Sequence, residues 1–119
     1  MPYKLRKAPA RRNPISSKGA FNYLTDRWLR HCVAQSGRSY GTNPSHTLRF
    51  DGVWLFSDGQ RFARFVPSGM GGLSTHAILL VPHKEWPRNR QVAAVRNAAT
   101  AWQVPTIYEV TQSQLEELT

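Results

Sequence analysis

Two Asp-Gly dipeptides, at positions 51–52 and 58–59, divide residues 47–66 into three short runs rich in apolar residues: TLRF, VWLFS and QRFARFV. Asp and Gly tolerate the positive φ that tight hairpin turns need, so Asp-Gly between such runs is a strong hairpin signal. The stretch therefore predicts a three-stranded antiparallel β-meander in which Asp51 and Asp58 are turn residues. One face of this meander must be covered by another layer of the protein.

The third run of the meander does not alternate cleanly between apolar and polar residues. Successive side chains of a regular strand point to opposite faces, which would place Arg61 on one face and Arg64 on the other. Neither face of this strand is then purely apolar. The middle run differs, because it is apolar on both faces and suits a central strand.

The aromatic residues of the meander allow two interpretations. Trp54, Phe56 and Phe62 are ordinary core residues, since aromatic side chains dominate small cores, or they are rings on an open face. In the second case strand pairing brings Arg49 or Arg61 alongside exposed rings. Single-stranded nucleic-acid binders use this arrangement, because bases stack on rings while guanidinium groups follow the phosphates.

The clearest helix is expected over residues 88–103, where Val92, Val95, Ala99 and Trp102 recur at intervals of three and four. Prolines at positions 87 and 105 mark its two limits. The many alanines on this segment allow close approach to a sheet. We expect this helix to cover the meander.

Residues 20–33 also favour a helix, with Phe21, Leu24, Trp28 and Cys32 on one stripe. A strand over residues 23–33 is the alternative, because the segment is rich in aromatic residues and has no strong cap. Residues 37–45 and 67–72 are predicted to be loops, since both are rich in Gly, Pro and Ser.

The remaining segments complete an α+β fold. The continuous aliphatic run at 77–81 ends a buried central strand, residues 106–110 form a last strand, and residues 113–119 form a short acidic helix or a frayed end. The sequence therefore predicts an antiparallel sheet of about four or five strands, with the β-meander at its core, packed against one main helix. We expect residues 20–119 to form this single domain.

Positive charge is concentrated at the start of the chain. The protein has 16 Lys and Arg against 7 Asp and Glu, a formal net charge of +9, and residues 1–18 hold six basic residues and no acid. With three prolines and few large apolar residues, residues 1–19 are predicted to be a flexible basic arm that orders on a phosphate backbone. The alternative is a tail that only adds solubility or that folds onto the protein's own acids.

The sequence contains no pattern expected of an enzyme or a metal site. Cys32 is the sole cysteine, no Cys-x-x-Cys is present, and the histidines at 31, 46, 76 and 83 have no ligand spacing. The glycine-rich loop at 67–72 lacks the Lys-Ser or Lys-Thr of a phosphate-binding loop. We therefore expect no cofactor, no metal and no catalytic residues, with a hydrolase or nuclease only a distant third possibility.

No run approaches the length of a membrane span, and the basic start lacks the apolar stretch of a secretory signal. These features predict a cytoplasmic protein without a membrane partner, in the host cytoplasm if it is viral, with the nucleus as an option in a eukaryote.

The segments WLFSDGQRFARF at 54–65 and LSTHAILLV at 73–81 resemble small uncharacterised proteins of bacteriophages and related mobile elements. The similarity covers about 30 residues, and this chain has Asp58 where that group would carry an aromatic residue. The resemblance implies a viral or mobile-element origin, and it implies no mechanism.

The charge and the aromatic residues together predict a non-enzymatic protein that binds DNA or RNA with little sequence preference. The alternative is a small viral-type interaction module or inhibitor that docks an acidic protein surface, and an exposed sheet edge would also allow a homodimer. The predicted nucleic-acid contacts are Arg6, Lys7, Arg11 and Arg12 in the arm, Arg49, Arg61 and Arg64 in the meander, and Lys84, Trp86, Arg88 and Arg90 before and within the main helix.

Overall fold

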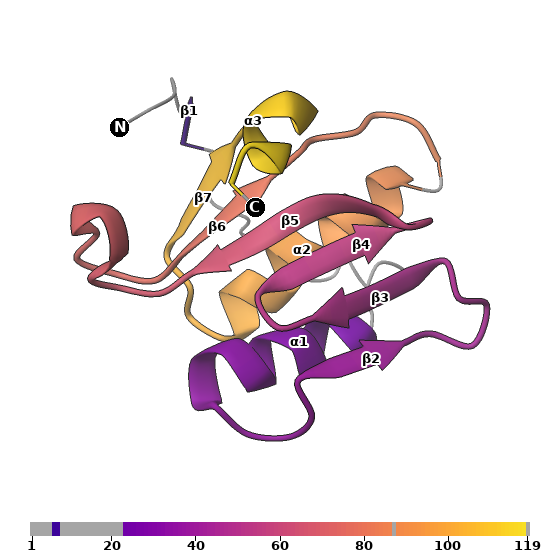
Figure 1. The fold of residues 1–119 in the computed structure, drawn as a ribbon, viewed down its shortest axis with the longest axis horizontal. Helices are drawn as coiled ribbons and strands as arrows, with labels where there is room; N and C mark the ends of the chain where they lie inside the picture. Colours follow the sequence, from indigo (N-terminus) through magenta and orange to yellow (C-terminus); the bar gives the residue numbers. More distant parts are fainter. Residues whose placement is uncertain (1–5, 8–22, 87, 119) are drawn as a thin grey trace.

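The structure, a computed structural model, describes residues 6–7, 23–86 and 88–118 (Figure 1). Its strands are β1 (Arg6–Lys7), β2 (Tyr40–Thr42), β3 (Leu48–Asp51), β4 (Trp54–Ser57), β5 (Gln60–Val66), β6 (Ala77–Leu80) and β7 (Thr106–Glu109). Its helices are α1 (Tyr23–Ala34), α2 (Arg88–Ala101) and α3 (Gln112–Glu116), with the 3-10 turn η2 (Met70–Gly72) after β5. The predicted α+β class is confirmed.

The strands form one sheet in the order β1-β7-β6-β5-β4-β3-β2. Neighbouring strands are antiparallel except β6 and β7, which run parallel because α2 crosses between them. Six strands, β2 to β7, make up the body of the sheet, and the two-residue β1 extends its edge beside β7. The strand count is therefore higher than the sequence predicted.

The strand β2 lies inside the segment predicted to be a loop. Gly41, at its centre, faces Phe50 of β3, and a Cβ added to Gly41 would meet a ring atom of Phe50 at 2.8 Å. Only glycine lets the backbone lie this close to the ring. The glycine that suggested a loop is thus what allows this edge strand to pack.

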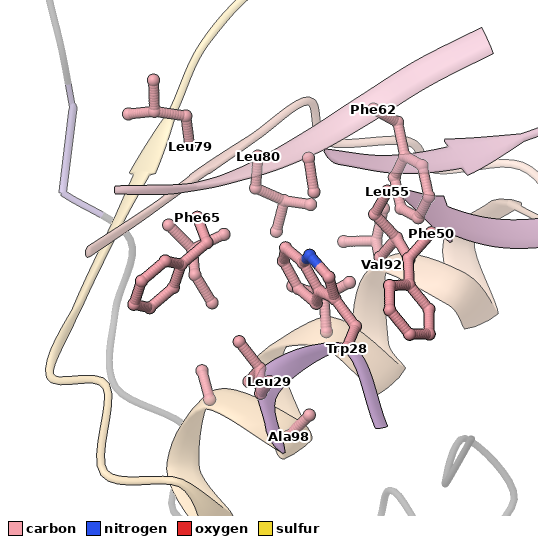
Figure 2. Close-up of a cluster of buried hydrophobic side chains, with 14 of the residues drawn as sticks. Trp28, Leu29, Phe50, Leu55, Phe62, Phe65, Leu79, Leu80, Val92 and Ala98 are labelled. Atoms are coloured by element: carbon pink, nitrogen blue, oxygen red, sulfur yellow. The ribbon is translucent and has the colours of Figure 1, made fainter. Parts of the chain in front are cut away.

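Two helices, and not one, cover the core face of the sheet (Figure 1). α1 packs against β2 and β3 and against α2. Trp28 and Leu29 of α1 are fully buried, and Figure 2 shows them beside Val92 and Ala98 of α2 and beneath Leu80 of the sheet. Burying each large apolar side chain contributes about 1.5–3 kcal/mol. The predicted helix at the start of the domain is confirmed over the described residues.

The two helices are also joined by a polar contact. Trp102, just past the end of α2, donates from its Nε1 to Oδ1 of Asp26 on α1 at 2.9 Å. The stripe predicted on α2 is confirmed, because Val92, Val95 and Ala99 are buried.

The two Asp-Gly dipeptides occupy different positions in their turns. Asp58 and Gly59 have φ of 49° and 81°, so both occupy the positive-φ centre of the β4–β5 hairpin, as predicted. At the β3–β4 turn Gly52 has φ of 60°, but Asp51 is the last residue of β3, paired with Trp54. Asp51 was predicted to be a turn residue, and the structure instead places it on the surface of the sheet.

The last element is α3, which confirms a short helix near the predicted position. Thr111 caps this helix, since its hydroxyl accepts from the backbone N–H of Gln114 at 3.1 Å while the Gln114 side chain accepts from the backbone N–H of Thr111. Gln112 donates to the carbonyl oxygen of Arg61 on β5 at 2.7 Å. None of the helices in the described part of the chain combines the length and apolar character that a membrane span requires.

Candidate nucleic-acid interface

A β-bulge in β5 decides which side chains share the open face of the sheet. Opposite Leu55 of β4 lies Ala63, but the next residue, Phe56, faces Arg61, so β5 contains one extra residue, Phe62. The extra residue resets the alternation. Arg61 and Arg64 therefore lie on the same face, and the expectation that they lie on opposite faces is wrong.

Two cross-strand rows occupy this face across β2, β3, β4 and β5. Residues directly opposite each other in antiparallel strands project to the same side, and the pairing of the four strands aligns four residues in each row. We call these eight side chains the two-row surface. The first row is Tyr40, Asp51, Trp54 and Arg64, and the second row is Thr42, Arg49, Phe56 and Arg61.

Within the two-row surface, arginines and aromatic rings are stacked on one another. The guanidinium carbon of Arg49 lies 3.9 Å from the ring centre of Phe56, and that of Arg61 lies 4.6 Å from Trp54 and 5.9 Å from Phe56. The guanidinium carbon of Arg64 lies 5.5 Å from the ring centre of Trp54. These distances are within the range of cation–π attraction. The stacking holds three positive charges in a fixed array.

Burial separates the aromatic residues of the meander into two groups. Phe62 is fully buried in the core, as Figure 2 shows, together with Phe50 and Leu55. Trp54 and Phe56 are only partly buried and lie on the two-row surface. The core interpretation is thus correct for Phe62, and Trp54 and Phe56 are rings on the open face.

The three arginines of the two-row surface have no carboxylate partner among the described residues. Other arginines do, since Arg30 pairs with Asp26 at 3.5 Å and Arg96 pairs with Glu109 at 2.8 Å. The Nε atoms of Arg61 and Arg64 are buried against their neighbours and have no hydrogen-bond partner in the described part of the chain. Asp51 is the one carboxylate in the two rows, and it forms no ion pair with these arginines, so their charges are not paired within the described part of the chain.

The open face of the sheet is no longer accessible to solvent over β6, the strand beyond β5. Arg64 is paired with Leu79 of β6, and Leu79 is 4% exposed, so the surface over β6 is closed. At the other end, between the two rows, a hollow is lined by Tyr40, Gly41, Thr42, Arg49, Phe50 and Asp51. The accessible part of the face thus runs from the hollow at β2 to Arg64.

The predicted contacts of the arm fall mainly outside the described residues. Arg11 and Arg12 are both outside the described residues. Arg6 and Lys7 form β1, where they pair with Glu109 and Tyr108 of β7, and their backbone is thus part of the sheet. Three strand spacings separate β1 from β5, which is roughly 14 Å.

The residues around the start of α2 form a separate group. Ser57 and Gln60 accept hydrogen bonds from Arg88 at 3.3 and 2.9 Å, and Ser57 pairs with Leu48, a core residue. Arg88 thus joins α2 to the β4–β5 turn from the core side of the sheet. Its guanidinium is largely occupied, so we do not include it in the interface.

Lys84, Trp86 and Arg90 are exposed, and the exposed fraction of Trp86 is 75%. Of the described arginines, none stacks on Trp86, and no described contact joins these three residues to the two-row surface.

Sequence reasoning missed three members of the two-row surface. Tyr40 and Thr42 were assigned to a loop, although Tyr and Thr flanking a glycine are typical strand residues. Asp51 was assigned to a turn. Arg49, Arg61 and Arg64 were predicted, and the structure brings them together.

The described residues hold no group of three or more His, Cys, Asp or Glu side chains placed to bind a metal ion. Cys32 is partly buried and its Sγ donates to the carbonyl oxygen of Gly52 at 3.6 Å. Burial raises the pKa of this thiol to about 12, so it is not a thiolate at neutral pH.

No protein-family model matches the chain, and no curated protein or solved structure is significantly similar to it. The resemblance to bacteriophage proteins therefore stays a prediction. The chemistry of the two-row surface is the basis for a functional proposal.

Proposed function

We propose that this protein is a non-enzymatic nucleic-acid-binding protein that holds a single strand of DNA or RNA on the two-row surface with little sequence preference. The observation that carries the proposal is the stacked array of Arg49, Arg61 and Arg64 on Trp54 and Phe56, with no described carboxylate paired to any of the three.

A stacked guanidinium can bind nucleic acid in two ways at once. Its edge carries N–H donors that match phosphate oxygens, and its free plane accepts a stacked base. The rings beneath Arg49 and Arg61 hold these planes in place before the strand arrives, which lowers the entropy lost on binding. The array therefore combines the phosphate contacts and stacking surfaces of single-strand binders.

The sheet also suits a single strand better than a duplex. Bases of a duplex are stacked inside it and cannot reach rings on a flat sheet, whereas unpaired bases can be splayed onto such a surface. The net charge of +9 adds a sequence-independent attraction to any polyanion, which a duplex also feels. We expect binding to both forms at low salt, with the single strand favoured.

The test is a fluorescence-polarisation titration with labelled single- and double-stranded DNA and RNA at about 50 mM salt, where phosphate contacts are strongest. The double variant R61Q/R64Q should bind the single strand at least about tenfold more weakly than the wild type, since each lost contact to a charged group is worth about 1.5–3 kcal/mol.

The matched control is R27Q/R30Q, which removes the same number of charges from the exposed side of α1. If both double variants weaken binding equally, net charge alone drives the association and the two-row surface has no special role. If the wild type binds none of the four nucleic acids, the proposal is wrong, and a protein partner with an acidic surface becomes the leading hypothesis.

The contribution of the N-terminal arm is best tested by substitution. Deleting residues 1–18 would also remove β1 from the edge of the sheet. Replacing Arg11 and Arg12 with Gln leaves β1 in place, and this variant should weaken binding to all sequences alike if the arm contacts phosphates.

A further inference from the structure

We propose that the hollow at the β2 end of the two-row surface takes one unpaired guanine base of the bound strand, recognised by Asp51 and Arg49. This inference rests on the proposed function, and it adds a base preference to a surface that otherwise binds without sequence preference.

The hollow lies between the two rows, with Tyr40 and Asp51 on one side and Thr42 and Arg49 on the other. Neighbouring residues of the same face are two positions apart along a strand, about 6.8 Å. A flat base stacked on both sides needs twice the stacking distance of about 3.4 Å, which is the same width. The spacing of the rows therefore suits one planar ring.

Two walls of the hollow are suited to stacking. Tyr40 is 58% exposed, and the guanidinium carbon of Arg38 lies 6.0 Å from its ring centre. The guanidinium carbon of Arg49 lies 3.9 Å from the ring centre of Phe56, and Arg49 also lines the hollow. A base in the hollow would thus meet an aromatic ring and a guanidinium plane, both of which stack bases.

Asp51 is the feature that a general phosphate-binding surface does not explain. It is exposed, and in the described part of the chain its carboxylate has no hydrogen bond and no ion pair. A carboxylate repels phosphate but accepts hydrogen bonds from N–H groups on base edges. Its place beside Arg49, two residues away on β3, puts one acceptor group and one donor group at the same hollow.

Guanine matches the carboxylate of Asp51 better than adenine does. Its Watson–Crick edge carries two adjacent donors, N1–H and the N2 amino group, which a carboxylate accepts together. Arg49 contributes to the site as the stacking wall opposite Tyr40, and the choice between bases is made at Asp51. Adenine has the N1 acceptor at the corresponding edge, which the carboxylate would repel. The hollow should therefore favour guanine over adenine.

The experiment compares ten-nucleotide single strands that differ at one central position. The host is oligouridine or oligothymidine, whichever the wild type binds more tightly, and the central base is guanine, adenine or hypoxanthine (the base of inosine). The wild type should bind the guanine strand at least about fivefold more tightly than the adenine strand, the lower limit for one bidentate contact. Hypoxanthine lacks the N2 amino group, so its strand should bind more weakly than the guanine strand.

The protein variant is D51N, and the matched control is D58N, because Asp58 is the aspartate of the other Asp-Gly turn and lies outside the hollow. The ratio of guanine to adenine affinity should fall to about one in D51N, since an amide no longer accepts both donors, and should persist in D58N.

A wild-type ratio near one, or a ratio unchanged in D51N, overturns the inference and leaves the proposed function standing. Failure to bind any of the strands overturns the proposed function itself. The hypoxanthine comparison uses the wild-type protein only, so equal binding of the hypoxanthine and guanine strands overturns the inference even if D51N does not fold.

Discussion

Arg61 and Arg64 lie three residues apart on β5, and both of their guanidinium groups contact the ring of the same residue, Trp54, at 4.6 and 5.5 Å. A regular strand would not allow this, because residues three apart project to opposite faces. The extra residue of the bulge, Phe62, makes it possible: Phe62 and Ala63 are both buried in the core, and Arg61 and Arg64 on either side of them lie on the open face. β-bulges often re-aim a side chain next to a functional site in this way.

The salt dependence of binding should report the number of arginines that touch phosphate. Each single variant, R49A, R61A or R64A, should reduce the slope of log affinity against log salt by about 0.7 if that arginine neutralises one phosphate of a single strand. The slope is measured by titrations between about 50 and 200 mM salt. R27A, on α1, should leave the slope unchanged, and equal slopes for all four variants would contradict the proposed interface.

Phe62 should be a principal stabilising residue of the sheet. F62A removes a fully buried ring at the bulge and should lower the free energy of unfolding by about 3–5 kcal/mol, measured by urea denaturation. The control is Y23A, because Tyr23 is 66% exposed and its loss should change stability by no more than about 0.5 kcal/mol. Equal losses in the two variants would contradict the packing of the bulge.

Cys32 should resist alkylation in the folded protein. Burial raises the pKa of the thiol from its ordinary value of 9.0 to about 12, so almost no thiolate is present at pH 8. Iodoacetamide should therefore react with the native protein far more slowly than with the protein unfolded in urea, as followed by mass spectrometry. Rapid alkylation of the native protein would show that the thiol is not buried.

The raised pKa of Cys32 should also reduce the stability of the folded protein at high pH. Between pH 9 and about 12 the unfolded chain loses the thiol proton and the folded protein keeps it, so the unfolded state binds fewer protons and stability falls as pH rises. Below pH 9 both states keep the proton and the effect is absent. C32A should remove this part of the pH dependence, which thermal unfolding at pH 8 and pH 10.5 would reveal.

Arg88 should stabilise the fold by linking α2 to the β4–β5 turn. R88A should reduce the free energy of unfolding by about 1–3 kcal/mol, because Ser57 and Gln60 lose their donor at the β4–β5 turn. R88K should not restore this stability, since an ammonium cannot span both partners as the planar guanidinium does. R90A, an exposed neighbour on α2, should change stability by no more than about 0.5 kcal/mol.

Arg88 also affects the pKa of His83. Burial lowers the pKa of His83, and the positive charge of Arg88 lowers it further. R88A should therefore raise this pKa towards its ordinary value without fully restoring it, which an NMR titration would detect. Because the folded-state pKa is lowered, the stability linked to His83 is present above pH 6.5 and is lost as pH falls below it. That loss should be smaller in R88A.

The sequence alone determined the elements with strong local signals. The Asp58-Gly59 hairpin, the aliphatic strand β6 and the apolar stripe of α2 were predicted because turn chemistry and side-chain periodicity act over a few residues. The three arginines of the meander were also identified as candidates from the sequence, since their charge and their aromatic neighbours are visible in it.

Only the tertiary structure decided which of these residues meet. The bulge at Phe62 depends on pairing with β4 and has no local signal. β2 has only a weak one, the Tyr and Thr that flank Gly41, and its place depends on the close approach of Gly41 to Phe50. Asp51 became a residue of the sheet surface, and Arg88 became a partly buried link between α2 and the β4–β5 turn, through partners on other strands. Cross-strand register and packing are long-range properties, and they are what assembled separate residues into the two-row surface.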